Sequence, residues 1–199
     1  MNPGKKFEIG RRFVVFPFYD GQADADPGDR IPIFIGPGRA FGSGEHETTA
    51  SCLEELEVMD GLVGSTVLDL GCGTGILAIG AANLGARRVI AVDPEPDSVE
   101  ASRANARMNG VKSVVEAIQG DIAAVKGRRF DIIMANIYGD VLLSIAPDTP
   151  LFLNPSGRLL LSGIHYDYAY EVKKAYTDIE FRIIRARALE NYCTLVLGK

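Results

Sequence analysis

The chain has 199 residues, of which 47% are hydrophobic, and a formal net charge of -5. This length suffices for one folded core, and the negative charge gives no long-range attraction to nucleic acid. No stretch approaches the roughly 18 apolar residues of a membrane span, and the start of the chain lacks the apolar core of a secretory signal. Its 3 cysteines have neither disulfide nor metal-ligand spacing, which favours reduced thiols. The sequence therefore predicts a cytoplasmic protein without a metal site and without a membrane or nucleic-acid partner.

The first part of the chain is rich in loops. Residues 11–20 (RRFVVFPFYD) and 30–36 (RIPIFIG) are predicted to be strands, because β-branched and aromatic residues are bounded there by turn residues. We expect a hairpin or an edge ribbon packed on the rest of the chain, since fewer than about 45 residues rarely form a core alone. Apolar residues then recur at helical spacing from residue 47, and Thr48 or Thr49 is the expected cap.

Strand and helix patterns alternate from Thr66 onward. Runs of Val, Ile and Leu, bounded by Gly, Asp or Asn, are typical of parallel strands that helices cover on both faces. The last two runs, residues 180–189 and 192–198, have no helix between them and are predicted to pair antiparallel. We expect one α/β domain over residues 1–199, in which residues 1–45 form the ribbon and a covering loop and residues 46–199 form the core.

The sequence VLDLGCGTGILAI, residues 67–79, indicates a ligand-binding turn between a strand and a helix. At the carboxyl end of a parallel strand, residues without a Cβ let a ligand approach the backbone, and the next helix presents free N–H groups. Gly71, Gly73 and Gly75 are therefore candidate binding residues. The dinucleotide fingerprint G-x-G-x-x-G is not met, because Ile76 takes the place of its third glycine, which disfavours an NAD-dependent oxidoreductase.

The following strand ends in Asp93, at a suitable distance along the chain to accept hydrogen bonds from both hydroxyls of a ribose. Together with VLDLGCGTG, this residue resembles the class I S-adenosylmethionine (AdoMet) methyltransferases. The resemblance implies AdoMet as the cofactor, its methionine part at the glycine turn, its ribose on Asp93 and its adenine near Asp121. It also implies a Rossmann-like fold, with a seven-stranded, mostly parallel sheet and an antiparallel last strand.

Two further motifs narrow the resemblance. PGRAFGSGEHETTASCLEEL, residues 37–56, and ANIYGDVL, residues 135–142, are similar to the PrmA family, the methyltransferases of ribosomal protein L11. Position by position, Thr49, Gly71, Asp93 and Asn136 match the residues with which that family binds AdoMet. Its members carry a separate amino-terminal recognition domain, and too few residues precede the core here to form one. The acceptor therefore stays open.

Methyl transfer from a sulfonium is an in-line displacement, which needs a lone pair on a correctly placed acceptor and no metal. Asn136 is predicted to orient that acceptor and Tyr138 to wall its pocket, as the two catalytic candidates. The glycines of residues 41–49 suit a loop that covers the cofactor and excludes water. His46 is a proton acceptor or a structural cap, and His165 lines the substrate mouth or is ordinary surface.

The sequence as a whole predicts an AdoMet-dependent methyltransferase of protein amino groups, on a lysine side chain or an α-amine, with a ribosomal protein as a candidate partner. A methyltransferase for small molecules or RNA is the alternative. A non-catalytic AdoMet-binding module is disfavoured, because Asn136 and the loop of residues 41–49 exceed what holding a cofactor needs. The oligomeric state is not indicated.

Overall fold

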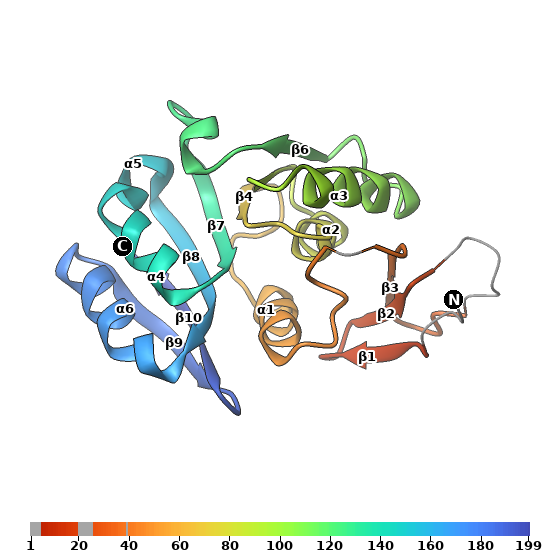
Figure 1. Cartoon of the computed structure of the whole chain (residues 1–199), viewed down its shortest axis with the longest axis horizontal. Coiled ribbons are helices and arrows are strands. Elements are labelled where there is room, and N and C mark those ends of the chain that lie inside the picture. The colour runs from red at the N-terminus through yellow and green to blue at the C-terminus, as the bar shows by residue number, and fades with distance from the viewer. Residues whose placement is uncertain (1–4, 20–25, 39) are drawn as a thin grey trace.

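The computed structural model describes residues 5–19, 26–38 and 40–199, which form a small sheet, a large sheet and covering helices (Figure 1). The small sheet contains β1 (Phe7–Ile9), β2 (Phe13–Pro17) and β3 (Ile31–Ile35). The large sheet contains β4 (Thr66–Leu70), β5 (Arg88–Asp93), β6 (Val115–Gln119), β7 (Phe130–Asn136), β8 (Leu153–His165), β9 (Arg182–Ala188) and β10 (Tyr192–Gly198). The helices are α1 (Glu47–Glu57), α2 (Ile76–Asn83), α3 (Pro96–Met108), α4 (Gly139–Ile145), α5 (Thr149–Phe152) and α6 (Tyr166–Asp178), with short 3-10 turns η1 (Ile122–Val125) and η2 (Ala146–Asp148).

The large sheet has the strand order β6-β5-β4-β7-β8-β10-β9. Strands β6, β5, β4, β7 and β8 pair parallel, and β10 runs antiparallel to both of its neighbours. The predicted seven-stranded, mostly parallel sheet with an antiparallel last strand is therefore confirmed. Because the parallel strands share one direction, their carboxyl ends meet at one side, where ligands bind in open α/β sheets.

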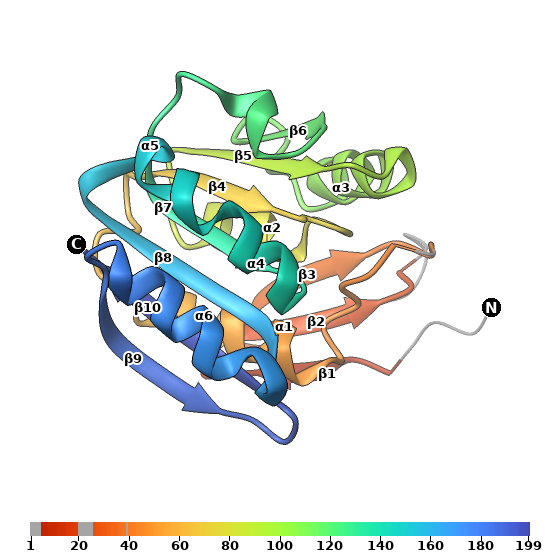
Figure 2. The same cartoon turned by 60° about the vertical axis from the view of Figure 1, so that its left-hand side comes forward.

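Alternating side chains along each strand divide the core into two layers. Val67 of β4 belongs to a cluster with α1, α2 and α3, whereas Leu68 faces a cluster that includes α4 and α6. Figure 2 shows α4 and α6 in front of the large sheet and α1 and α2 behind it. Both faces are thus covered, which explains why the strands are nearly continuous runs of Val, Ile and Leu.

The small sheet packs on the outer side of α2. A Cβ atom added to Gly80 of α2 would lie 2.6 Å from a methyl group of Leu53 and 3.7 Å from the ring of Phe13. Phe13 and Ile33 are fully buried. Because both sides of α2 are covered, the helix is apolar all round, up to Asn83 at its end.

Of the two arrangements expected for the first part of the chain, the hairpin is wrong, whereas a ribbon packed on the rest of the chain is present. Strand β2 pairs antiparallel with β1 but parallel with β3, in a sheet separate from the large one. Parallel neighbours need a long crossover in place of a tight turn. Residues 18–30 supply this connection, and much of the turn-rich segment predicted there lies outside the described residues.

The start of α1 also differs from the prediction. The cap of α1 is His46, whose Nδ1 accepts a hydrogen bond from the backbone N–H of Thr48, and Thr49 likewise lies inside the helix. The helical pattern after β7 is divided into α4, η2 and α5, because Pro147 and Pro150 lack the N–H that a continuing helix needs. Among the described residues, no helix is both long and apolar enough to cross a membrane.

Three carboxylates on α1 connect segments that are distant in the sequence. Glu47 accepts hydrogen bonds from the β9–β10 turn, 2.7 Å from the backbone nitrogen of Glu190. The buried Glu55 pairs with Arg185 of β9 at 2.7 Å. Glu57 accepts two backbone N–H groups of the β1–β2 turn, at 2.9 and 2.8 Å. Helix α1 therefore joins the small sheet to the last strands of the large sheet.

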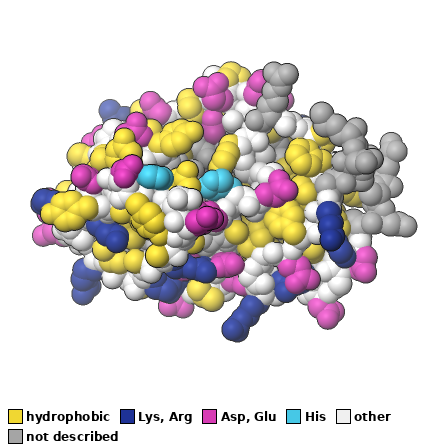
Figure 3. Space-filling view, turned by 60° about the horizontal axis from the view of Figure 1, so that its bottom comes forward, with side chains coloured by type: hydrophobic (Ala, Val, Ile, Leu, Met, Phe, Trp, Pro, Cys, Tyr) yellow, Lys and Arg dark blue, Asp and Glu magenta, His cyan; other side chains and the backbone are white. Residues whose placement is uncertain are grey.

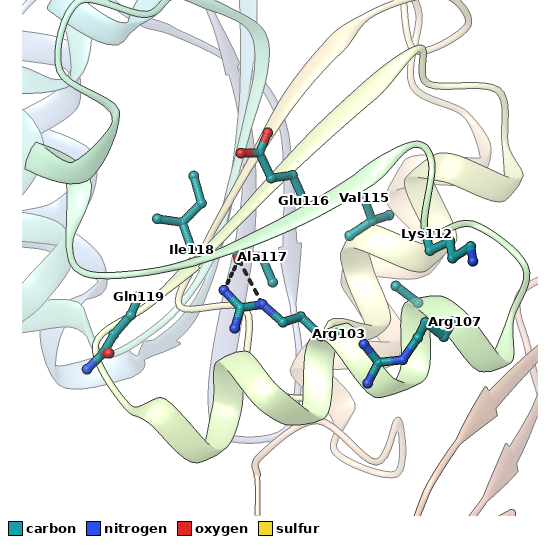
Figure 4. A pocket seen from close by; sticks show the side chains of 9 residues that line it. Arg103, Arg107, Lys112, Val115, Glu116, Ala117, Ile118 and Gln119 are labelled. Atoms are coloured by element: carbon teal, nitrogen blue, oxygen red, sulfur yellow. Dashed lines mark hydrogen bonds between the residues drawn. The ribbon is translucent and has the colours of Figure 1, made fainter.

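An arginine covers the edge strand β6. Nε and Nη2 of Arg103 on α3 donate to the backbone carbonyl of Ala117, at 3.2 and 2.9 Å (Figure 4). This contact borders a shallow cavity of about 490 Å³, where Arg107 and Lys112 also lie. The outward carbonyl of Ala117 is thereby occupied, which protects this edge against pairing with another strand.

Candidate active site

A cavity of about 510 Å³ opens at the carboxyl ends of β4 to β7. Its walls come from the glycine turn after β4, the end of β5, the β6–η1 loop and the β7–α4 loop. The start of α1 and Tyr192 of β10 close the remaining side. This position and volume are those of a small-molecule site in an open α/β sheet.

Two glycines of the turn expose bare backbone to the cavity. Gly71 and Gly73 have φ values of 73° and 53°, which favour glycine. A Cβ atom would lie 2.3 Å from Ile137 at the first position and 2.2 Å from the carbonyl oxygen of Phe41 at the second. The covering loop is docked on this turn, because the backbone N–H of Thr74 donates to the Phe41 oxygen at 2.9 Å.

The other glycine of the motif and Thr49 lie outside the cavity lining. Gly75 is the N-cap of α2, and a Cβ atom there would lie 2.5 Å from the hydroxyl of Ser102 on α3, so this glycine permits close packing of two helices. Thr49 is buried, and its hydroxyl accepts a hydrogen bond from Nδ2 of Asn136 at 3.3 Å. Its neighbour Thr48 lines the cavity. Gly75 and Thr49 therefore lie behind the residues that line the cavity, and their predicted role in cofactor binding stays a prediction.

Asp93 lies where the sequence places it, at the end of β5 and in the cavity wall. Its two carboxylate oxygens accept backbone N–H groups of Gly73 at 2.9 Å and Glu95 at 3.0 Å. An ionised carboxylate has about four acceptor positions, so both oxygens keep capacity for ligand hydroxyls. The hydrogen bond to Gly73 also fixes the carboxylate relative to the glycine turn.

The same end of the cavity contains Asp121, in the loop after β6. Its carboxylate accepts the backbone N–H of Ala123 at 2.8 Å and so caps η1. With Asp93 and Glu95, it makes this end of the cavity rich in hydrogen-bond acceptors. The arrangement suits a hydroxyl-bearing or amino-bearing ligand and disfavours a phosphate.

The opposite end contains the two catalytic candidates. Asn136, half-buried at the end of β7, uses its Nδ2 for Thr49, and its Oδ1 has no hydrogen-bond partner among the described residues. Tyr138 lines the cavity mouth and is 79% exposed. The structure thus brings both residues to one place, and their predicted catalytic roles stay predictions.

A row of rings borders this end. His46 lies 5.6 Å from Phe41 and 5.3 Å from Tyr192, and Tyr192 lies 5.5 Å from His165, each between ring centroids. Nδ1 of His46 is 2.8 Å from the hydroxyl of Thr48, so the capping interaction occupies that nitrogen. Sequence reasoning missed Tyr192, since the first residue of an ordinary strand carries no local signal of a site.

Sequence reasoning also missed a buried carboxyl group behind the glycine turn. Asp69 of β4 is 1% exposed and accepts the backbone N–H of Ala78 at 3.1 Å. Because no side chain adjacent to α2 caps its first turn, Asp69 provides this hydrogen bond from the strand. Desolvation by burial raises the pKa of Asp69 to about 7.

The sequence of this chain is similar to those of known proteins of one family. A family described as ribosomal protein L11 methyltransferase (PrmA) matches residues 4–199. The chain belongs to the PrmA family. A ribosomal protein L11 methyltransferase of Desulforamulus reducens is 39% identical over 181 residues, which cover 90% of this chain and 58% of that protein. A Pseudomonas aeruginosa protein of the same name is 41% identical over 177 residues, covering 89% and 58%. The chain thus spans less than two thirds of the length of these relatives.

Solved structures of PrmA-like folds agree with the architecture. The ribosomal protein L11 methylase of Lactobacillus delbrueckii subsp. bulgaricus superposes with a TM-score of 0.87 at 29% identity, over 98% of both chains. A 16S rRNA methyltransferase (RsmC) of T. thermophilus, in complex with AdoMet and guanosine, superposes with a TM-score of 0.68 at 26% identity, over 83% of this chain and 46% of that one. These neighbours confirm the Rossmann-like methyltransferase fold.

Proposed function

We propose that this PrmA-family chain is an AdoMet-dependent methyltransferase that modifies an amino group of a protein, on a lysine side chain or at an α-amine. The observation that carries the proposal is the cavity in which bare backbone at Gly71 and Gly73 faces the fixed carboxylate of Asp93. The names of the relatives support a ribosomal protein, L11, as the acceptor and hence a cytoplasmic site of action.

The residues at the β4 and β5 ends fit AdoMet. Gly71 and Gly73 line the cavity with backbone alone, which the methionine part can approach, and Asp93 keeps acceptor positions for ribose hydroxyls. Asp121, in the next loop, is the candidate acceptor for the adenine amino group. When bound, AdoMet supplies a methyl group that its sulfonium already activates.

The chain then has to hold and desolvate the acceptor. Oδ1 of Asn136 can accept a hydrogen bond from an amine and align its lone pair, without competing as a nucleophile. Phe41 and Tyr138 border the same end, where their rings can cover a bound acceptor and displace water from it. Desolvation disfavours the ammonium form and so lowers the pKa of the arriving amine, which frees the lone pair that attacks.

Two measurements test this proposal. Calorimetry with AdoMet and with NAD should show binding of AdoMet and weaker or no binding of NAD. Incubation with methyl-labelled AdoMet and purified ribosomal protein L11, followed by mass spectrometry, should locate the label on lysine side chains or the α-amine. Tighter binding of NAD would reject the cofactor, and label that enters only RNA or small molecules of a cell extract would reject the acceptor.

A further inference from the structure

Exposed aromatic side chains lie just before α4, where Tyr138 lines the cavity, and on the neighbouring α6. Tyr138 is 79%, Tyr170 72% and Tyr168 41% exposed. Tyr168 packs over the start of α4, because a Cβ atom added to Gly139 would lie 2.6 Å from the Cβ atom of Tyr168. Because Tyr138 also lines the cavity, this aromatic surface is continuous with the proposed active site. We name it the α4–α6 rim, with the members Tyr138, Asp140, Asp167, Tyr168, Tyr170 and Glu171.

The carboxylates of the α4–α6 rim have few partners. Asp167 lies 3.2 Å from Nδ1 of His165, and its side chain is 84% exposed. Among the described residues, Asp140 contacts only the N–H of the next residue and Glu171 has no ion pair. These three carboxylates therefore face solvent, and of the two lysines that follow Glu171 on α6, Lys174 pairs with Asp178 at 2.6 Å.

Positive side chains are absent from the described segments that border the mouth, and Arg39, Lys173 and Lys174 lie just beyond those segments in the sequence. The bordering segments, residues 40–57, 136–148, 165–171 and 189–192, contain no Lys or Arg, although the chain has 21 of them. In Figure 3, the two histidines lie near the centre of the visible face among hydrophobic and acidic side chains, and Lys and Arg gather toward its margins. Basic residues occur instead at or near the amino ends of the strands, as at Arg87, Arg88, Arg129 and Arg158.

Exposed aromatic rings and solvent-facing carboxylates together favour a positively charged partner. The faces of tyrosine rings attract ammonium and guanidinium groups, and surface carboxylates pair with them. The same surface repels the phosphates of RNA, whose binding needs Lys and Arg. We propose that the α4–α6 rim docks an extended segment rich in Lys and Arg, which belongs to the protein whose amine is methylated. The identity of that segment as substrate rests on the proposed function, whereas its binding does not require catalysis.

A variant with Asp167→Asn, Tyr170→Ala and Glu171→Gln tests the docking surface, because none of the three residues lines the cavity. The probe is a fluorescein-labelled octalysine peptide, measured by anisotropy at low salt. The unaltered chain should bind it, more weakly as salt rises, and the triple variant should bind it about five- to tenfold more weakly. AdoMet affinity and melting temperature should not change, which shows that the variant is folded.

A matched control removes the same number of charges elsewhere. Asp60→Asn with Glu180→Gln changes two exposed carboxylates outside the segments that border the mouth, and peptide affinity should stay within about twofold. Equal peptide affinity in the triple variant and the unaltered chain overturns the proposal. The proposal is also overturned if a ten-nucleotide RNA binds the unaltered chain more tightly than the peptide does and the triple variant no longer binds that RNA. If the peptide binds as expected but no methyl group is transferred to ribosomal protein L11, docking stands and the proposed acceptor fails.

Discussion

Replacing Phe13 by Ala should destabilise the whole chain, although this residue lies in the small sheet. Phe13 is 0% exposed and belongs to the cluster that contains α1, α2 and Val67 of the large sheet. Truncation of a fully buried phenylalanine costs about 3–5 kcal/mol, from lost transfer free energy and the cavity that remains. For a chain of this size, that loss lowers the melting temperature by about 6–20 °C. Urea unfolding followed by circular dichroism should show one transition at a lower midpoint with an unchanged slope.

Phe18→Ala is the matched control in the same part of the chain. Phe18 is 38% exposed, so its truncation should cost less than about 1.5 kcal/mol. If Phe13→Ala unfolds at the midpoint of the unaltered chain, or unfolds in two steps of which the first leaves the large sheet intact, the small sheet is not part of the common core. Comparable losses in the two variants would mean that burial does not determine the effect.

Three further changes test the site. Burial raises the pKa of Asp69 from 3.8 to about 7, so the folded chain binds the proton more tightly than the unfolded chain, and stability should fall as pH rises between these values. In urea titrations, Asp69→Asn should reduce the fall of the unfolding free energy with pH. If the free energy falls equally with pH in the variant and the unaltered chain, Asp69 does not cause that fall. Asp93→Ala should weaken AdoMet binding by about 1–3 kcal/mol in calorimetry, because ribose hydroxyls lose their acceptor, and unchanged binding would exclude that role. Asn136→Ala should reduce the single-turnover rate of methyl transfer more than AdoMet affinity, whereas equal losses would indicate a role in cofactor binding alone.

The large sheet could be predicted from the sequence because its strands are buried on both faces. The runs around Leu68, Ile90 and Ile133 read as strands whatever their neighbours are, and the absence of a helix between β9 and β10 indicates their antiparallel pairing. The direction of β3 relative to β2 could not be predicted in this way. The residues of β2 and β3 would suit a parallel or an antiparallel pair equally well. The direction depends on the connection between them, residues 18–30, which has no periodic pattern.

The residues of the candidate site could likewise be predicted only in part. Asp93 and Gly73 could be located because their roles depend on the ends of strands, which the sequence marks. Gly75 could not be distinguished from Gly73, because a glycine that admits a neighbouring helix and one that admits the backbone of the covering loop look alike in a sequence. Tyr192 reaches the cavity only through the pairing of β10 with β8, which places it beside His165. Contacts between residues so far apart depend on tertiary structure.

The place of β10 in the large sheet sets an order for folding during synthesis. Strand β10 follows β9 in the chain but lies between β8 and β9, so β9 has no hydrogen-bonding partner in the sheet until residues 192–198 have been made. Glu47, in the first third of the chain, likewise cannot accept its hydrogen bond from Glu190 until the turn before β10 has been made. Such long-range pairings are slow to form and leave strand edges exposed meanwhile. A nascent chain that stops before β10 therefore holds an unprotected β8 edge and an open cavity wall, which expose it to aggregation and proteolysis.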